Sequence, residues 1–164
     1  MTYLLDANVL IIANRQYYAI DRVPDFWDWL IAKGQSGDIK IAEEVFDEFA
    51  GGSDALADWA SDDEVRSSLV LPEAVNINHV RRVISEGYAS DLTDDEIEQV
   101  GRDPFLIAHA LANPSNRTVV TLETSKPNRV RANRHVPDVC RSLNVGCVDT
   151  FGMLFSLDFR IGSR

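Results

Sequence analysis

The chain opens with two short apolar runs that a single carboxylate separates. The first run, Tyr3–Leu5, ends at Asp6, and the second, Val9–Ile12, follows almost at once. This pattern predicts a buried strand that ends at Asp6 and a helix that begins just after it and ends near Arg15. An Asp at such a junction can cap the helix, and it can also be an active-site carboxylate at the carboxyl edge of a parallel sheet.

The same arrangement recurs twice along the chain. Ile39–Ile41 predicts a short strand, and the helix after it carries Glu48 beside its buried face. Thr118–Leu122 is a β-branched run of the kind buried in parallel sheets, and Glu123 follows it immediately. Glu44 lies on the same side of its helix as Glu48, so either could be the second acid, and a charged surface explains this pair taken alone.

A further acid begins the most clearly specified helix of the chain. Asp103 is predicted at the N-cap and Pro104 at the first helical position, and both residue types are favoured there. A capping carboxylate whose outer oxygen faces a cleft can also bind a metal, so Asp103 is a candidate site residue. His109 is a single His on this helix and is interpreted as structural.

The remaining pattern predicts the rest of the fold. The other expected elements are a last strand over 145–148 and helices over 24–31, 54–60, 72–87, 93–101, 137–143 and 150–157. Residues 65–71 alternate weakly and predict a strand or an extended connector. The stripe of Phe26, Trp27 and Leu30 predicts core rather than stacking on bases. Because strands and helices alternate throughout, we expect one three-layer α/β/α domain over residues 1–164 with a mostly parallel central sheet.

Composition limits the classes of protein to which the chain can belong. Its net charge of -10 is unfavourable for coating nucleic acid and suits an enzyme with a concentrated carboxylate site or a protein with a basic partner. No apolar stretch approaches the roughly 20 residues of a membrane span, and no secretory signal is visible, so we expect a cytoplasmic protein without a membrane partner. Cys140 and Cys147 form no zinc-type motif and are interpreted as free thiols.

The acids can converge at the carboxyl edge of the sheet; they are Asp6, Glu48, Asp103 and Glu123. Four carboxylates in one place repel one another, so they stay ionised together only around a cation. Oxygen ligands without His or Cys select Mg²⁺ or Mn²⁺ over zinc. Such a site acidifies a bound water and neutralises a phosphate, which is the chemistry of phosphodiester hydrolysis. The chain has no Ser-His-Asp or Cys-His motif and no glycine-rich nucleotide-binding loop.

One basic segment interrupts this acidic chain. It follows Glu123, and its cations are Lys126, Arg129, Arg131 and Arg134. These side chains could bind the phosphates of RNA beside the acidic crevice, or they could form a solvated loop. The sequence leaves both interpretations open.

Four segments resemble the signature blocks of PIN domains, and they occur in the order found in that family. They are Leu4–Ile11, the helix that carries Glu48, Asp103–Leu111 and Val119–Glu123. Further aromatic segments resemble a prokaryotic PIN-like subgroup, DUF4411: Tyr17-Tyr18, Phe26–Trp29 and Asp58–Ala60. PIN domains are typically Mg²⁺- or Mn²⁺-dependent ribonucleases on a parallel sheet, and many small ones are the toxins of toxin–antitoxin pairs.

The resemblance implies roles for individual residues. By that resemblance, the metal ligands and catalytic residues are Asp6, Glu48, Asp103 and Glu123. Asn8 and Thr121 would orient these acids through hydrogen bonds. The chain differs from the family pattern in its fourth acid, which is Glu rather than Asp, and in residues 53–100, which are longer than in minimal members.

The expected function is a metal-dependent endoribonuclease that acts as the toxin of a toxin–antitoxin pair. Its expected partners are an RNA substrate and a basic antitoxin protein, and a homodimer is a further expectation. One alternative is a catalytically silent PIN fold that serves as a binding or assembly module. The other is a phosphatase with Asp6 as nucleophile, a chemistry that requires a second Asp where this chain has Asn8.

Overall fold

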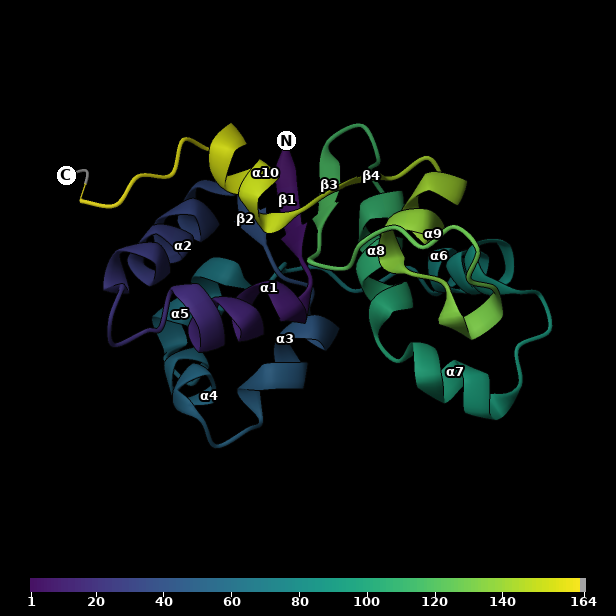
Figure 1. Ribbon diagram of the computed structural model, residues 1–164, viewed down its shortest axis with the longest axis horizontal. Coiled ribbons are helices and arrows are strands. Elements are labelled where there is room, and N and C mark those ends of the chain that lie inside the picture. The colour runs from purple at the N-terminus through teal and green to yellow at the C-terminus, as the bar shows by residue number, and fades with distance from the viewer. Residues whose placement is uncertain (163–164) are drawn as a thin grey trace.

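A parallel sheet lies at the centre of the computed structural model, which describes residues 1–162 (Figure 1). The four strands found within these residues are all parallel and lie in the order β2 (Ile39–Lys40), β1 (Thr2–Leu5), β3 (Arg117–Val120) and β4 (Gly146–Val148). Leu5 pairs with Val120, so Asp6 and Thr121 follow at adjacent strand ends. The carboxyl ends of the strands meet at one edge, as in other open parallel sheets.

Helices flank the sheet and complete the predicted three-layer α/β/α fold. The α-helices are α1 (Ala7–Ile12), α2 (Pro24–Ser36), α3 (Glu43–Ala50), α4 (Ala55–Ala60), α5 (Asp63–Leu69), α6 (Ile77–Arg82), α7 (Asp94–Val100), α8 (Asp103–Leu111), α9 (Val136–Ser142) and α10 (Thr150–Ser156). The other helical segments are the π-helices η1 (Ala13–Tyr17) and η2 (Val83–Tyr88) and the 3₁₀-helix η3 (Arg131–Asn133). Figure 1 shows α1–α5 gathered about the β1 and β2 side of the sheet and α6–α9 about the β3 and β4 side.

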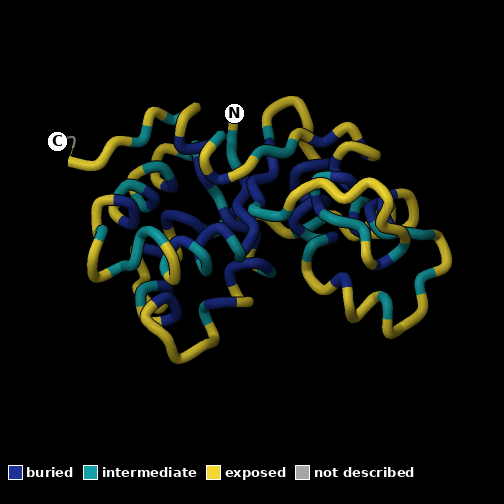
Figure 2. The backbone as a smooth tube through the Cα atoms, in the orientation of Figure 1, coloured by how far each residue is buried: buried dark blue, intermediate teal, exposed yellow. Residues whose placement is uncertain are grey.

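The core consists of the strands and the helix faces that cover them (Figure 2). Leu5 of β1, Val120 of β3 and Phe26 of α2 are completely buried. Each such side chain contributes about 1.5–3 kcal/mol through removal of its apolar surface from water. Trp27 is also buried, and its indole nitrogen donates a hydrogen bond to the Tyr18 carbonyl at 2.7 Å. The apolar stripe of α2 is therefore core, as predicted.

The weakly alternating segment 65–71 is the clearest error of the sequence analysis, because most of it lies in helix α5. Asp62 caps this helix, and its carboxylate accepts a backbone hydrogen bond at 2.8 Å. Val65 and Leu69 are buried four residues apart on one face of the helix. The helical period and the cap therefore determine the structure here, and the apparent alternation does not.

Two predicted helix starts are also displaced. The helix expected from residue 72 begins only at Ile77, where the Asn76 side chain caps it, and it ends in η2. Asp103 is not the N-cap of α8 but its first residue, since Arg102 occupies the cap position and Pro104 follows at the second. An acid in the first turn remains favourable next to the positive end of the helix dipole.

Both cysteines are free thiols, as predicted. Cys140 on α9 lies against Cys147 on β4, and this contact together with burial raises the pKa of Cys140. No helix within residues 1–162 is both long and apolar enough to span a membrane.

Candidate functional site

Asp6 lies at the carboxyl end of β1, in the N-cap position of α1. Its side chain is buried and makes no capping hydrogen bond. Instead, its Oδ2 accepts a hydrogen bond from the Thr121 hydroxyl at 2.8 Å. The Thr121 hydrogen bond therefore holds the Asp6 carboxylate toward the end of β3.

A hydrogen-bond network around Thr121 joins the ends of β1 and β3. Asn8 donates from Nδ2 to the Thr121 hydroxyl oxygen at 3.2 Å, and its Oδ1 accepts from the Leu122 amide at 3.1 Å. The Glu123 amide also donates to the Thr121 hydroxyl oxygen, at 3.2 Å. Thr121 thus accepts two hydrogen bonds and donates its proton to Asp6, which fixes the direction of that carboxylate.

Glu123 is oriented by the start of α9. Its Oε2 accepts a hydrogen bond from the Val136 amide at 2.8 Å. Its Oε1 accepts no hydrogen bond from any side chain or amide within residues 1–162, so this oxygen is available to a ligand. Oε2 therefore fixes the orientation of the Glu123 side chain, and Oε1 can contact a ligand.

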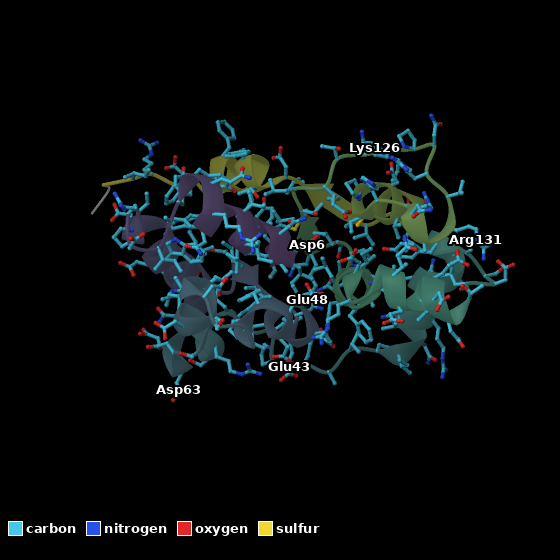
Figure 3. All side chains as sticks on the ribbon, turned by 60° about the horizontal axis from the view of Figure 1, so that its bottom comes forward. Asp6, Glu43, Glu48, Asp63, Lys126 and Arg131 are labelled. Carbon is cyan, nitrogen blue, oxygen red and sulfur yellow. The ribbon has the colours of Figure 1, made fainter. Side chains whose placement is uncertain are left out.

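Glu48, and not Glu44, belongs with these acids. Figure 3 shows Asp6 and Glu48 close together in the middle of the molecule. Burial, and then the charge of Asp6, raise the pKa of Glu48, whereas the charge of Arg102 lowers it. Glu44 instead faces His109, with 3.5 Å between Glu44 Oε2 and His109 Nε2. Of the two acids that the sequence left open, Glu48 is therefore the one that lies beside Asp6.

Asp103 shows how strongly the acids act on one another. Burial, and then the charges of Asp6, Glu123 and Glu48, raise the pKa of Asp103 to about 8. Burial also raises the pKa of Asp6, with a further contribution from Glu123, while the Thr121 hydrogen bond lowers it. Asp6, Glu48 and Glu123 are thus all close enough to Asp103 for their charges to favour its protonated form.

The chemistry of this donor set fits a hard divalent cation. All donors are carboxylate oxygens, which suit Mg²⁺ or Mn²⁺, and a bound cation would relieve their mutual repulsion. Within residues 1–162, however, no group of three or more Asp, Glu, His or Cys side chains is arranged to hold an ion. Metal binding would therefore have to draw these side chains together.

Three clefts adjoin the acids. One, of about 350 Å³, is called here the Arg129 cleft, and its lining residues are Tyr88, Gln99, Asp103, Glu123, Arg129, Ala132, Asn133, Arg134 and His135. A second cleft, of about 270 Å³, includes Glu48 of α3 and Arg15 of η1. A third, of about 260 Å³, includes Thr121 and Glu123. Space for a substrate therefore adjoins Glu48, Asp103 and Glu123.

The basic segment divides into two pairs of cations. Arg131 forms ion pairs with Asp91 and Glu96 at 2.8 and 2.9 Å, and Arg134 donates hydrogen bonds to the Gly87 carbonyl and other internal acceptors. These two side chains hold α7 and η2 in place. The other pair, Lys126 and Arg129, is exposed and forms no ion pair within residues 1–162. Figure 3 shows Lys126 and Arg131 well apart, each at the surface.

The sequence analysis missed three residues at this site: Arg15, Tyr88 and Arg102. Arg102 donates a hydrogen bond to the Glu44 carbonyl at 2.7 Å, and its position next to Asp103 is a signal that could have found it. Tyr88 lines the Arg129 cleft although it lies far from the acids in sequence. Arg15 lines the cleft beside Glu48, and no motif marks either of these two residues.

Comparison with known proteins gives a single finding. The family model described as "Domain of unknown function (DUF4411)" matches residues 3–161. No curated protein and no solved structure matches the chain. The match covers nearly the whole chain, including every acid of the site.

Proposed function

The chain belongs to the DUF4411 family, and we propose that it is a metal-dependent endoribonuclease. In this proposal it hydrolyses RNA phosphodiester bonds with Mg²⁺ or Mn²⁺ as cofactor. The residues that would hold the ion and carry the reaction are Asp6, Glu48, Asp103 and Glu123. The resemblance of the segments around these acids to PIN domains supports the proposal.

The observation that carries the proposal is the gathering of four coupled acids at the carboxyl edge of the sheet. Their charges raise the pKa of Asp103 to about 8, in addition to the effect of burial. Carboxylates that repel one another destabilise the free protein, and strongly shifted pKa values of this kind are concentrated at functional sites. A divalent cation is the ligand that this arrangement would bind most favourably.

The residues of the chain have separate tasks in this mechanism. A bound Mg²⁺ or Mn²⁺ supplies charge neutralisation on the phosphate and acidification of a water. Thr121 and the Val136 amide hold the carboxylates of Asp6 and Glu123 in fixed directions. Asp103 holds a proton in the free protein and would release it when the ion binds, as protonated ligands do.

The biological setting is part of the proposal. We infer a cytoplasmic toxin of a toxin–antitoxin pair, because many small PIN domains have that role. The net charge of -10 would favour association with a basic antitoxin through complementary charge. A homodimer of the chain is compatible with this setting.

One alternative has a specific observation in its favour. Since residues 1–162 contain no preformed metal cage, a catalytically silent fold that serves as a binding module is the second candidate. A phosphatase with Asp6 as nucleophile is less well supported. Asn8, which stands where that chemistry requires an acid, uses both its amide oxygen and nitrogen in hydrogen bonds to the end of β3.

Cleavage of single-stranded RNA tests the proposal. Purified wild type should cleave a mixed-sequence RNA in the presence of Mn²⁺ and lose this activity in EDTA. Asp6→Asn should reduce the rate by at least about a hundredfold, since removal of one essential group at a catalytic site has effects of this order. The assay measures fragment length and rate on denaturing gels.

Asp28→Asn is the matched control, because Asp28 is exposed and forms no ion pair within residues 1–162. It should cleave at the wild-type rate. Equal cleavage by wild type and Asp6→Asn would indicate a contaminating nuclease. Absence of cleavage by wild type, with metal binding intact, would favour the silent module.

A further inference from the structure

Tyr88 has a buried hydroxyl for which the fold supplies no partner. The residue ends η2, is 7% exposed and lines the Arg129 cleft. Its hydroxyl oxygen is inaccessible and makes no hydrogen bond within residues 1–162. Burial of a hydroxyl without a hydrogen-bond partner is unfavourable, and π-helical turns like η2 are frequently found at functional sites. The feature that suits Tyr88 to a ligand is the combination of this unpartnered hydroxyl with a place in the lining of the Arg129 cleft.

Two of the four acids lie beside Tyr88 in the Arg129 cleft. Burial, and then the charges of Asp103 and Glu123, raise the pKa of the Tyr88 phenol above its ordinary value. Asp103 and Glu123 line the same cleft. A tyrosine hydroxyl is a hydrogen-bond donor, so it could donate to an acceptor oxygen of a ligand that reaches it from the cleft.

The rest of the cleft is suited to a polar, anionic ligand. Arg129 is exposed there and has no acidic partner within residues 1–162. Gln99 Nε2 donates to Asn133 Oδ1 at 2.8 Å, which leaves the Gln99 carbonyl as an acceptor and the Asn133 amide as a donor. The volume of about 350 Å³ lies within the range of small-ligand sites.

We propose that the Arg129 cleft is the subsite for the nucleotide beside the scissile phosphate. Arg129 binds the phosphate of that nucleotide, and the Tyr88 hydroxyl donates a hydrogen bond to one of its oxygens. The free amide groups of Gln99 and Asn133 face its base. The proposal rests on the ribonuclease function, and it requires an unpaired nucleotide, because only an unstacked base can enter a cleft.

Two tyrosine variants test this assignment. Tyr88→Phe removes only the hydroxyl, and Tyr17→Phe is its matched control. Tyr17 ends the other π-helix, and its hydroxyl is also buried, next to the Thr150 side chain, but it lines none of the clefts described above. Each change is made in an Asp6→Asn background so that RNA stays intact. Affinity is measured by fluorescence anisotropy with a random-sequence, single-stranded oligoribonucleotide.

We expect Tyr88→Phe to weaken RNA binding about threefold to tenfold, the effect of one hydrogen bond, and Tyr17→Phe to leave it unchanged. Tyr88→Phe should not melt below its parent, since it loses an unsatisfied buried group. Equal affinity of the parent and Tyr88→Phe, or a lower melting temperature of Tyr88→Phe, would overturn the subsite alone. A parent protein that binds no RNA would overturn the ribonuclease proposal and the subsite together.

In the wild-type background, the kinetics separate a ligand contact from a structural role. Tyr88→Phe should raise KM for RNA cleavage by a similar factor while kcat changes less. Loss of kcat alone, at unchanged KM, would contradict the contact with the bound nucleotide.

Discussion

At the scale of the residue, Asp6 and Asp103 show how the same side chain acquires different properties at one site. The Asp6 carboxylate accepts a hydrogen bond from Thr121, which lowers its pKa and partly offsets the effect of burial. The pKa of Asp103 is raised by burial and by three neighbouring carboxylates, with no contribution that lowers it. The proton of the free site is therefore expected on Asp103.

This difference predicts a pH dependence of stability. Folded Asp103 keeps its proton up to about pH 8, whereas an unfolded Asp loses it near 3.8, so the folded state binds more protons between these values. The free energy of unfolding of the metal-free protein should therefore decrease as pH rises from about 4 to about 8. The shifts of Asp6 and Glu48 act in the same direction.

Asp103→Asn should flatten this decrease and stabilise the metal-free protein at pH 8 by about 1–2 kcal/mol. This is less than the free energy that corresponds to the full pKa shift, because water in the cleft screens the charges. The substitution removes no capping hydrogen bond, since the Asp103 side chain makes none. Thermal unfolding in EDTA at several pH values measures the effect. A variant less stable than wild type throughout would show that Asp103 is mainly structural.

At the scale of the element, Arg117 connects β3 to α8 and to the segment after α5. Its guanidinium bonds Glu73 through both terminal nitrogens, at 2.6 and 2.9 Å, and donates to the His109 carbonyl at 2.8 Å. The Arg117 side chain is only 13% exposed. Arg117 begins β3, so this network lies at the opposite edge of the sheet from the acids.

Arg117→Met should therefore lower stability by about 1–3 kcal/mol, because it leaves the His109 carbonyl and Glu73 without their donor. RNA cleavage by the folded variant should stay at the wild-type level. Arg22→Met is the comparison, since the Arg22–Asp21 pair is fully at the surface and should contribute less than about 0.5 kcal/mol. Urea unfolding measures the free energy of unfolding of both variants. Equal losses would mean that the Arg117 network contributes no more to stability than a surface ion pair.

The elements that could be predicted from the sequence are those in which the hydrophobic period agrees with the residues that begin and end a helix or strand. The strand that ends before Asp6 was predicted because an apolar run stops abruptly there. The strand predicted over Thr118–Leu122 ends earlier, at Val120, and its parallel pairing with β1 places Thr121 beside Asp6. Helix α5 was missed because its short amphipathic pattern resembles weak alternation. Tyr88 could not be predicted as a cleft residue, since its position depends on how η2 packs against distant elements.

At the scale of the whole molecule, an acidic protein would have to bind an anionic substrate through a few local cations. The sequence suggested four cations after Glu123, but Arg131 and Arg134 are engaged in internal contacts. Lys126 and Arg129 are exposed without acidic partners within residues 1–162. The expected contribution to RNA binding therefore shifts from four side chains to two.

Replacement of Lys126 and Arg129 by Gln should weaken RNA binding and flatten its salt dependence. Each lost phosphate contact should reduce the slope of log affinity against log salt by about 0.7 for single-stranded RNA. Metal affinity should not change. RNA affinity at several salt concentrations measures the slope, with Arg131→Gln as a control that disturbs α7 but leaves the slope intact. An unchanged slope for the double variant would show that Lys126 and Arg129 are solvated and do not contact the RNA phosphates.

Binding of a divalent cation by the four acids is the central requirement of the proposed function. Isothermal titration with Mn²⁺ at pH 7 should show binding to wild type and to Asp28→Asn, and at least about tenfold weaker binding to Asp6→Asn. Buffers of different ionisation enthalpy should reveal proton release from Asp103 on binding. Equal heats for wild type and Asp6→Asn, or no binding to either, would contradict the account.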